Sequence, residues 1–120
     1  MEANEENLAH VAELLQRALE AGLEGAEWMS EHGLAWCCEA YNGIGPEFMG
    51  ERLRGKVTER LALFEPAALI HDGRNHVSDG TLPGFGRANA EFLYNCRKLA
   101  DLMYPWYSWR RYRARVRVLP

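Results

Sequence analysis

A histidine and an aspartate stand side by side at positions 71 and 72, directly after the apolar run Ala67-Ala68-Leu69-Ile70. Burying such a pair is costly unless both side chains have partners. A neutral imidazole can take a proton from water, and a carboxylate is a hard oxygen ligand for a cation. The same pattern is also typical of a helix end, where a backbone carbonyl satisfies the histidine and solvent covers the aspartate.

A glycine-rich segment precedes this pair in the chain. Asn42-Gly43-Ile44-Gly45-Pro46 cannot continue a helix, because it holds two glycines and ends in proline. Glycine allows backbone angles that turn several carbonyl oxygens to one side, and carbonyl oxygens plus one carboxylate suit calcium. If Asp72 supplied that carboxylate, His71 would remain free to act on water. Together they would form an ester-hydrolysis site with no nucleophilic serine.

Three segments in this order resemble the phospholipase A2 superfamily, and in particular its small prokaryotic and phage-encoded members. They are the glycine-rich loop, the segment Glu65-Pro66-Ala67-Ala68-Leu69-Ile70-His71-Asp72, and Ala88-Asn89-Ala90-Glu91-Phe92 in a later helix. The resemblance covers about Cys37 to Asp101. It implies two antiparallel core helices, a calcium ion as cofactor, and a phospholipid or a membrane surface as partner.

The resemblance also implies a role for each matching residue. His71 would be the general base, with Asn89 orienting its ring from the antiparallel helix. Asp72 would bind calcium together with backbone carbonyls of the loop residues Asn42, Gly43, Ile44 and Gly45. The implied activity is calcium-assisted hydrolysis of an acyl ester.

Two positions depart from the family pattern. Asn89 stands where the family usually has aspartate, and Asn75 stands where it commonly has tyrosine; the family's disulfides are absent as well. An asparagine can hold the imidazole but cannot stabilise its charged form, and in the serine-protease triad that replacement costs about 10⁴ in rate. The alternative is therefore a weak or non-catalytic protein, a phage- or prophage-associated accessory module on the same fold.

Hydrophobic spacing predicts an all-α fold. An amphipathic helix is expected over Leu8–Leu23, capped by Asn4 or Asn7, and a helical piece over residues 26–40 with a break near Gly33. Further helices are expected at Leu53–Phe64, at 66–72 and at Arg87–Tyr104, with a loop from Gly73 to Gly86. Residues 1–104 would form one helical domain, and residues 105–120 an aromatic and basic tail.

Composition limits the class of protein. The chain has 120 residues, 48% of them hydrophobic and 26% charged, which suits one soluble domain. No stretch is long and apolar enough to span a bilayer, and acidic residues 2–6 do not resemble a secretory signal. We therefore expect a chain made in the cytoplasm, and phage-associated or released if the resemblance extends that far. Cys37, Cys38 and Cys96 favour free thiols; a bond from Cys96 to Cys37 or Cys38 stays open for an exported protein.

Charge is distributed unevenly along the chain. Residues 1–40 hold nine acidic and one basic residue, whereas residues 97–120 hold one acidic and seven basic residues. The tail mixes its arginines with Trp106, Tyr107, Trp109 and Tyr112. This composition favours packing or a protein partner, then a lipid surface. Nucleic acid is disfavoured because the whole chain is acidic, with a pI near 5.8.

Overall fold

The computed structural model describes residues 1–42, 62–78, 80–103 and Ala114. Its elements, in chain order, are α1 (Glu5–Glu20), α2 (Ala26–Glu31), α3 (Leu34–Ala40), the 3-10 turn η1 (Ala62–Phe64), α5 (Glu65–His76) and α6 (Leu82–Met103). These described residues contain no strand, so the expected all-α class is confirmed. Within them, no helix combines the length and the apolar character needed to cross a membrane. The tail other than Ala114, and nearly all of the helix expected at Leu53–Phe64, lie outside the described residues.

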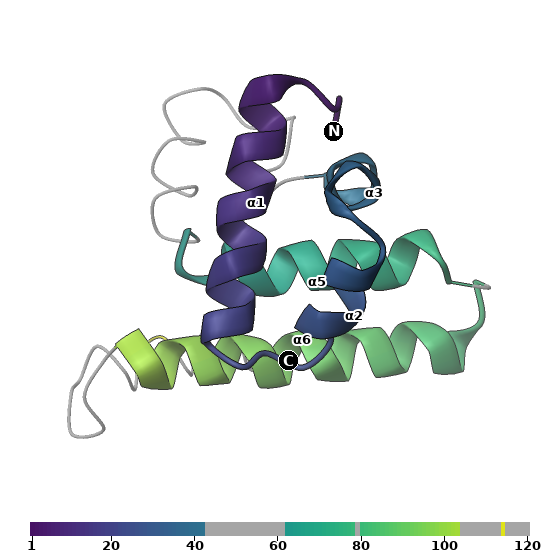
Figure 1. Cartoon of the computed structure of the whole chain (residues 1–120). Coiled ribbons are helices and arrows are strands. Elements are labelled where there is room, and N and C mark those ends of the chain that lie inside the picture. Colours follow the sequence, from purple (N-terminus) through teal and green to yellow (C-terminus); the bar gives the residue numbers. More distant parts are fainter. Residues whose placement is uncertain (43–61, 79, 104–113, 115–120) are drawn as a thin grey trace, which may run out of the picture.

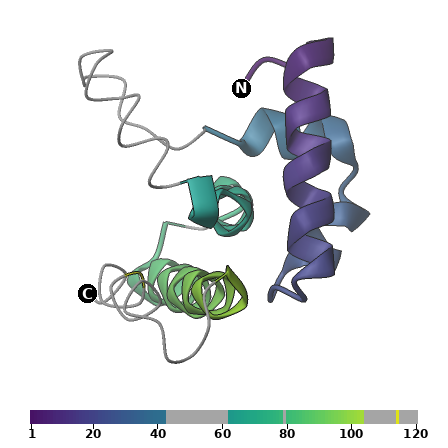
Figure 2. The same ribbon diagram turned by 90° about the vertical axis from the view of Figure 1, so that its left-hand side faces the viewer.

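The helices form two layers. Helices α5 and α6 lie side by side and antiparallel, and α1 crosses them at a steep angle (Figure 1). Seen from the side, α1, α2 and α3 make one layer while α5 and α6 make the other (Figure 2). The buried side chains of both layers form one continuous core that includes Val11, Leu14, Met29, Leu69 and Ile70.

The sequence predicted the first layer well. Asn4 caps α1, because its Oδ1 accepts a hydrogen bond from the backbone N–H of Asn7 at 2.8 Å. Val11, Leu14 and Ala18 are buried on α1, whereas Leu19 of the same helix is 41% exposed. The break between α2 and α3 lies at Gly33, whose φ of 88° belongs to the left-handed region that favours glycine.

The loop expected from Gly73 to Gly86 is wrong at both ends. Helix α5 continues to His76, and α6 begins at Leu82, five residues before the expected start. Thr81 precedes α6 as a cap, since its Oγ1 accepts from the Gly84 backbone N–H at 3.3 Å. Pro83 then falls in the first turn, where its missing N–H costs nothing. Gly73, Gly84 and Gly86 are therefore helical residues, whereas Gly80, with φ of 78°, lies in the connection between the two helices.

Gly73 is helical because of what lies beside it. A Cβ atom at this position would collide with the sulfur of Met29, which is fully buried in the core. The absence of a side chain lets α5 approach α2 closely. All three cysteines are free and fully buried, as favoured from the sequence. At the end of α6, Met103 is 56% exposed, although its spacing in the sequence predicts an apolar face shared with Phe92 and Leu99.

Candidate functional site

The antiparallel packing of α5 and α6 brings His71 next to Asn89. The His71 Nε2 atom lies 2.8 Å from Oδ1 of Asn89. The ring of Phe92, one turn further along α6, packs against the imidazole with 4.9 Å between ring centroids. His71 is half-buried, and it lies inside α5 and not at the end of the helix.

This contact determines which ring nitrogen is basic. An amide oxygen only accepts hydrogen bonds, so Nε2 of His71 must carry the proton. In the neutral ring the lone pair then lies on Nδ1. The Nδ2 of Asn75 is 3.4 Å from that nitrogen, which is longer than the usual donor–acceptor distance of 2.9–3.0 Å in a hydrogen bond from an N–H group. The Nδ1 lone pair is thus only weakly engaged and is free to accept a proton from water.

Asp72 faces the segment that leads into the glycine-rich loop. Its Oδ2 accepts a hydrogen bond from the backbone N–H of Asn42 at 2.9 Å. Burial raises the pKa of the Asp72 carboxyl, while the Asn42 N–H and the neighbouring His71 act in the opposite direction. Asp72 is therefore a half-buried carboxylate that lies next to the residue where the expected calcium loop begins.

A second carboxylate on α5, that of Glu65, holds the residue before Asn42. Glu65 Oε1 accepts from the Tyr41 hydroxyl at 2.6 Å and contacts His10 Nε2 at 2.8 Å. Tyr41 is fully buried, and burial with this hydrogen bond raises the pKa of its hydroxyl. Because Glu65 and Asp72 are two helical turns apart on α5, they hold the end of α3 at two successive residues.

Sequence reasoning missed the roles of Glu65, Tyr41 and His10. The one available signal was the spacing of Glu65 and Asp72, two acids seven residues apart around an apolar run. That spacing places both on one face of a helix, but nothing in the sequence names their partners on α1 and α3.

The structure therefore unites four of the seven residues expected at the site: His71 with Asn89, and Asp72 with Asn42. Gly43, Ile44 and Gly45 lie outside the described residues. Among the residues described, no three His, Cys, Asp or Glu side chains gather as a metal cluster. A calcium site here would combine the Asp72 carboxylate with backbone carbonyls, and such a hard oxygen donor set fits this ion.

No protein-family model, curated protein or solved structure matches this chain. The geometry of the residues themselves is therefore the basis for inferring function.

Proposed function

We propose that this chain is a phospholipase A2-like hydrolase that cleaves an acyl ester with water, using His71 as the general base. One observation carries the proposal. The contact of 2.8 Å between His71 Nε2 and Asn89 Oδ1 holds the ring while Nδ1 keeps its lone pair.

The proton transfers of the reaction involve this nitrogen and one water molecule. Nδ1 of His71 takes one proton as the water oxygen forms a bond to the ester carbonyl carbon. The tetrahedral intermediate then collapses, the bond to the alcohol oxygen breaks, and the imidazolium returns the proton to that oxygen. The products are a carboxylic acid and an alcohol. Asn89 keeps the ring oriented through both proton transfers.

Calcium is the cofactor in this proposal, held by Asp72 and by carbonyls of residues 42–45. When bound, the ion would stabilise negative charge on the attacked carbonyl oxygen. The Asn42 N–H bond to Asp72 supports this role, since it leaves the other carboxylate oxygen for a ligand. Tyr41 and Glu65 support it indirectly because they fix the chain just before the loop.

The test measures ester hydrolysis by the full chain on phospholipid vesicles, with calcium and with a chelator. His71→Ala should lose about 10²- to 10⁴-fold of the rate, the usual contribution of a general base. The control is His76→Ala, a histidine on the same helix whose ring packs against Trp36 at 5.4 Å. Equal rates for the wild type and His71→Ala would refute the proposal.

Calcium binding is measured separately by calorimetry. Asp72→Asn should abolish the binding heat, whereas Glu31→Gln, which changes an exposed carboxylate on α2, should leave it unchanged. A wild-type chain that neither binds calcium nor hydrolyses any vesicle lipid would also overturn the proposal.

A non-catalytic accessory protein on the same fold is the second candidate. It is favoured by the two amides that flank His71, since Asn89 and Asn75 both lack the charge that would stabilise an imidazolium. Calcium binding without turnover by the folded wild type would favour this candidate. Calcium-dependent turnover that requires His71 would eliminate it.

A further inference from the structure

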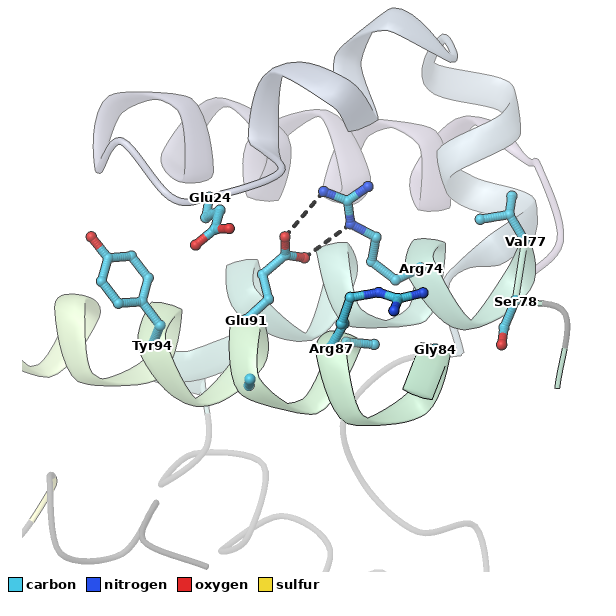
Figure 3. Close-up of a pocket in the computed structure, with 10 residues that line it drawn as sticks. Glu24, Arg74, Val77, Ser78, Gly84, Arg87, Glu91 and Tyr94 are labelled. Carbon is cyan, nitrogen blue, oxygen red and sulfur yellow. Dashed lines mark hydrogen bonds and ion pairs between the residues drawn. The ribbon is translucent and has the colours of Figure 1, made fainter. Parts of the chain in front are cut away.

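A cavity of about 730 Å³ lies where the last turn of α5 meets the first half of α6, with Glu24 reaching it from the connection between α1 and α2 (Figure 3). Its volume is in the range of small-molecule sites, roughly 300–1,000 Å³. Neither His71 nor Asn89 lines it. The cavity is therefore distinct from the site described above.

One side of the cavity is formed by an ion pair. Arg74 donates from Nε and Nη2 to the two carboxylate oxygens of Glu91, at 3.1 and 3.0 Å, and its guanidinium also lies 4.0 Å from the centre of a Trp28 ring. The Glu91 side chain is only 10% exposed. Gly25, with φ of 89°, makes room, because a Cβ there would come within 3.2 Å of both charged groups. The pair is held firmly, and its charges offset each other.

The remaining charged side chains lie at opposite ends of the cavity. Figure 3 shows Arg87 near Ser78 and Gly84 at one end of the cavity, with Glu24 and Tyr94 at the other. Neither the Arg87 guanidinium nor the Glu24 carboxylate forms a hydrogen bond or ion pair with other residues of the described ranges. The cavity therefore has a basic end and an acidic, aromatic end.

The acidic end is fixed by the backbone. Asn95 is fully buried, and its amide bonds both the N–H and the C=O of Glu24 at 2.9 Å. This anchor holds Glu24 at the rim while its side chain remains exposed. The ring of Tyr94 already has the Lys98 ammonium 6.0 Å from its centre, at the outer limit of a cation–π contact. Lys98 is itself held by the Gly22 carbonyl at 2.8 Å.

We infer that this cavity binds a small zwitterion, with its anionic oxygens on Arg87 and its ammonium group between Glu24 and Tyr94. An Arg fork donates to a carboxylate or a phosphate, and the Ser78 hydroxyl can add one more bond. A carboxylate beside an aromatic face suits a quaternary or primary ammonium. Val77, Ala88 and Ala90 add apolar surface to the lining of the cavity.

Both charges of the ligand are required by this arrangement. A simple anion would be attracted by Arg87 but repelled by Glu24. A simple cation would be attracted by Glu24 but repelled by Arg87. Phosphocholine has the required chemistry, and two sources could present it, the free molecule or the headgroup of a phosphatidylcholine surface. The inference does not depend on hydrolysis at His71.

Calorimetry with phosphocholine, choline and inorganic phosphate tests this site. Phosphocholine should bind at least about tenfold more tightly than either half alone, since each charged contact contributes more than about 1.4 kcal/mol. Arg87→Gln and Glu24→Gln should each weaken binding by about tenfold or more. Arg97→Gln, an arginine on α6 that does not line the cavity, is the matched control and should bind like the wild type.

A vesicle arm separates the two sources. Phosphatidylcholine vesicles that bind the wild type but not Arg87→Gln or Glu24→Gln would identify a lipid headgroup, and binding of free phosphocholine alone would identify a soluble zwitterion. His71→Ala should leave both results unchanged, so this inference and the proposed function can fail separately. Binding unaffected by Arg87→Gln and Glu24→Gln, or equally tight binding of choline or phosphate alone, would overturn the inference. So would the absence of binding in both arms.

Discussion

Two polar side-chain pairs join α5 to α6, about one helical turn apart, and they differ in charge. His71 and Asn89 form a neutral pair with a single contact of 2.8 Å, and Asn89 is exposed. Arg74 and Glu91 form a charged pair with two parallel hydrogen bonds, and Glu91 is nearly buried. Both pairs connect the same two helices, so their difference is one of chemistry.

The difference fits a structural role for the Arg74–Glu91 pair and, under the proposed function, a reactive role for the His71–Asn89 pair. Arg74 commits its fork to Glu91 and its flat face to Trp28, so little of its capacity remains for a substrate. In His71, only Nε2 has a close hydrogen-bond partner, and Nδ1 keeps its lone pair. A pair that is to move protons must remain partly unsatisfied, whereas a pair that joins helices is most stable when fully satisfied. Three experiments on these pairs, and one on the packing of α5 against α2 beside them, test this contrast.

The largest effect is expected from a charge placed in the neutral pair. Asn89→Asp should raise the rate of ester hydrolysis by about 10²-fold or more, because a carboxylate stabilises the imidazolium that an amide only orients. The measurement is kcat/KM on the same vesicle lipid. The matched control is the double variant His71→Ala/Asn89→Asp, which should gain nothing. No gain in the single variant would favour the accessory protein over a weakened enzyme.

The reverse experiment removes a charge from the structural pair. Arg74→Ala should lower the free energy of unfolding by about 3 kcal/mol, since it leaves the Glu91 carboxylate buried and unpaired. His71→Ala, which removes a neutral contact with an exposed amide, should cost no more than about 1 kcal/mol. Denaturant unfolding measures both.

A second variant separates charge from packing in this test. Arg74→Met with Glu91→Leu removes both charges together and should recover most of the loss, because no buried charge is then left unpaired. If Arg74→Ala and His71→Ala cost the same, the two pairs would not differ in the way their geometry implies.

Sequence patterns predicted the contact between His71 and Asn89 but not the ion pair between Arg74 and Glu91. His71, Asp72 and Asn89 were recognised because the types and order of neighbouring residues resemble a known arrangement. Arg74 and Glu91 lie in the same two segments, yet their pairing depends on the register in which α5 and α6 pack. A one-dimensional periodicity gives the face of a helix and leaves that register undetermined.

Helix boundaries, too, could be predicted only where local backbone chemistry determines them. Asn4 and Gly33 mark boundaries by local backbone chemistry, and both were predicted. Gly73 looks like a loop signal in the sequence. The structure explains this glycine differently, because a side chain there would collide with the sulfur of Met29, in a helix more than 40 positions away. Tyr41 and Glu65 were missed for this cause too, since their contact joins two elements.

Gly73 lies between His71 and Arg74 on α5, and its missing side chain lets this helix approach α2 closely. Gly73→Ala should destabilise the fold by about 1–3 kcal/mol, because the added carbon meets the buried Met29 side chain. Gly86→Ala is the control: it is also in a helix, but a Cβ there meets no atom within 4 Å. It should stabilise by about 0.5–1 kcal/mol through helix propensity alone. Equal signs for the two variants, measured by thermal unfolding, would contradict the packing reason given for Gly73.

The smallest effect is expected at Asn75, the second amide beside the imidazole. Its Nδ2 is 3.4 Å from His71 Nδ1 and its side chain is exposed, so Asn75→Ala should change stability by no more than about 0.5 kcal/mol. The rate should rise slightly, by no more than about threefold, since a weak donor no longer competes with water for the Nδ1 lone pair. A large loss of rate in the folded variant would instead mean that Asn75 helps to hold the attacking water. In that case both amides, Asn89 and Asn75, would take part in the reaction. The Nδ1 atom of His71 would then be without a close partner only when no substrate is bound.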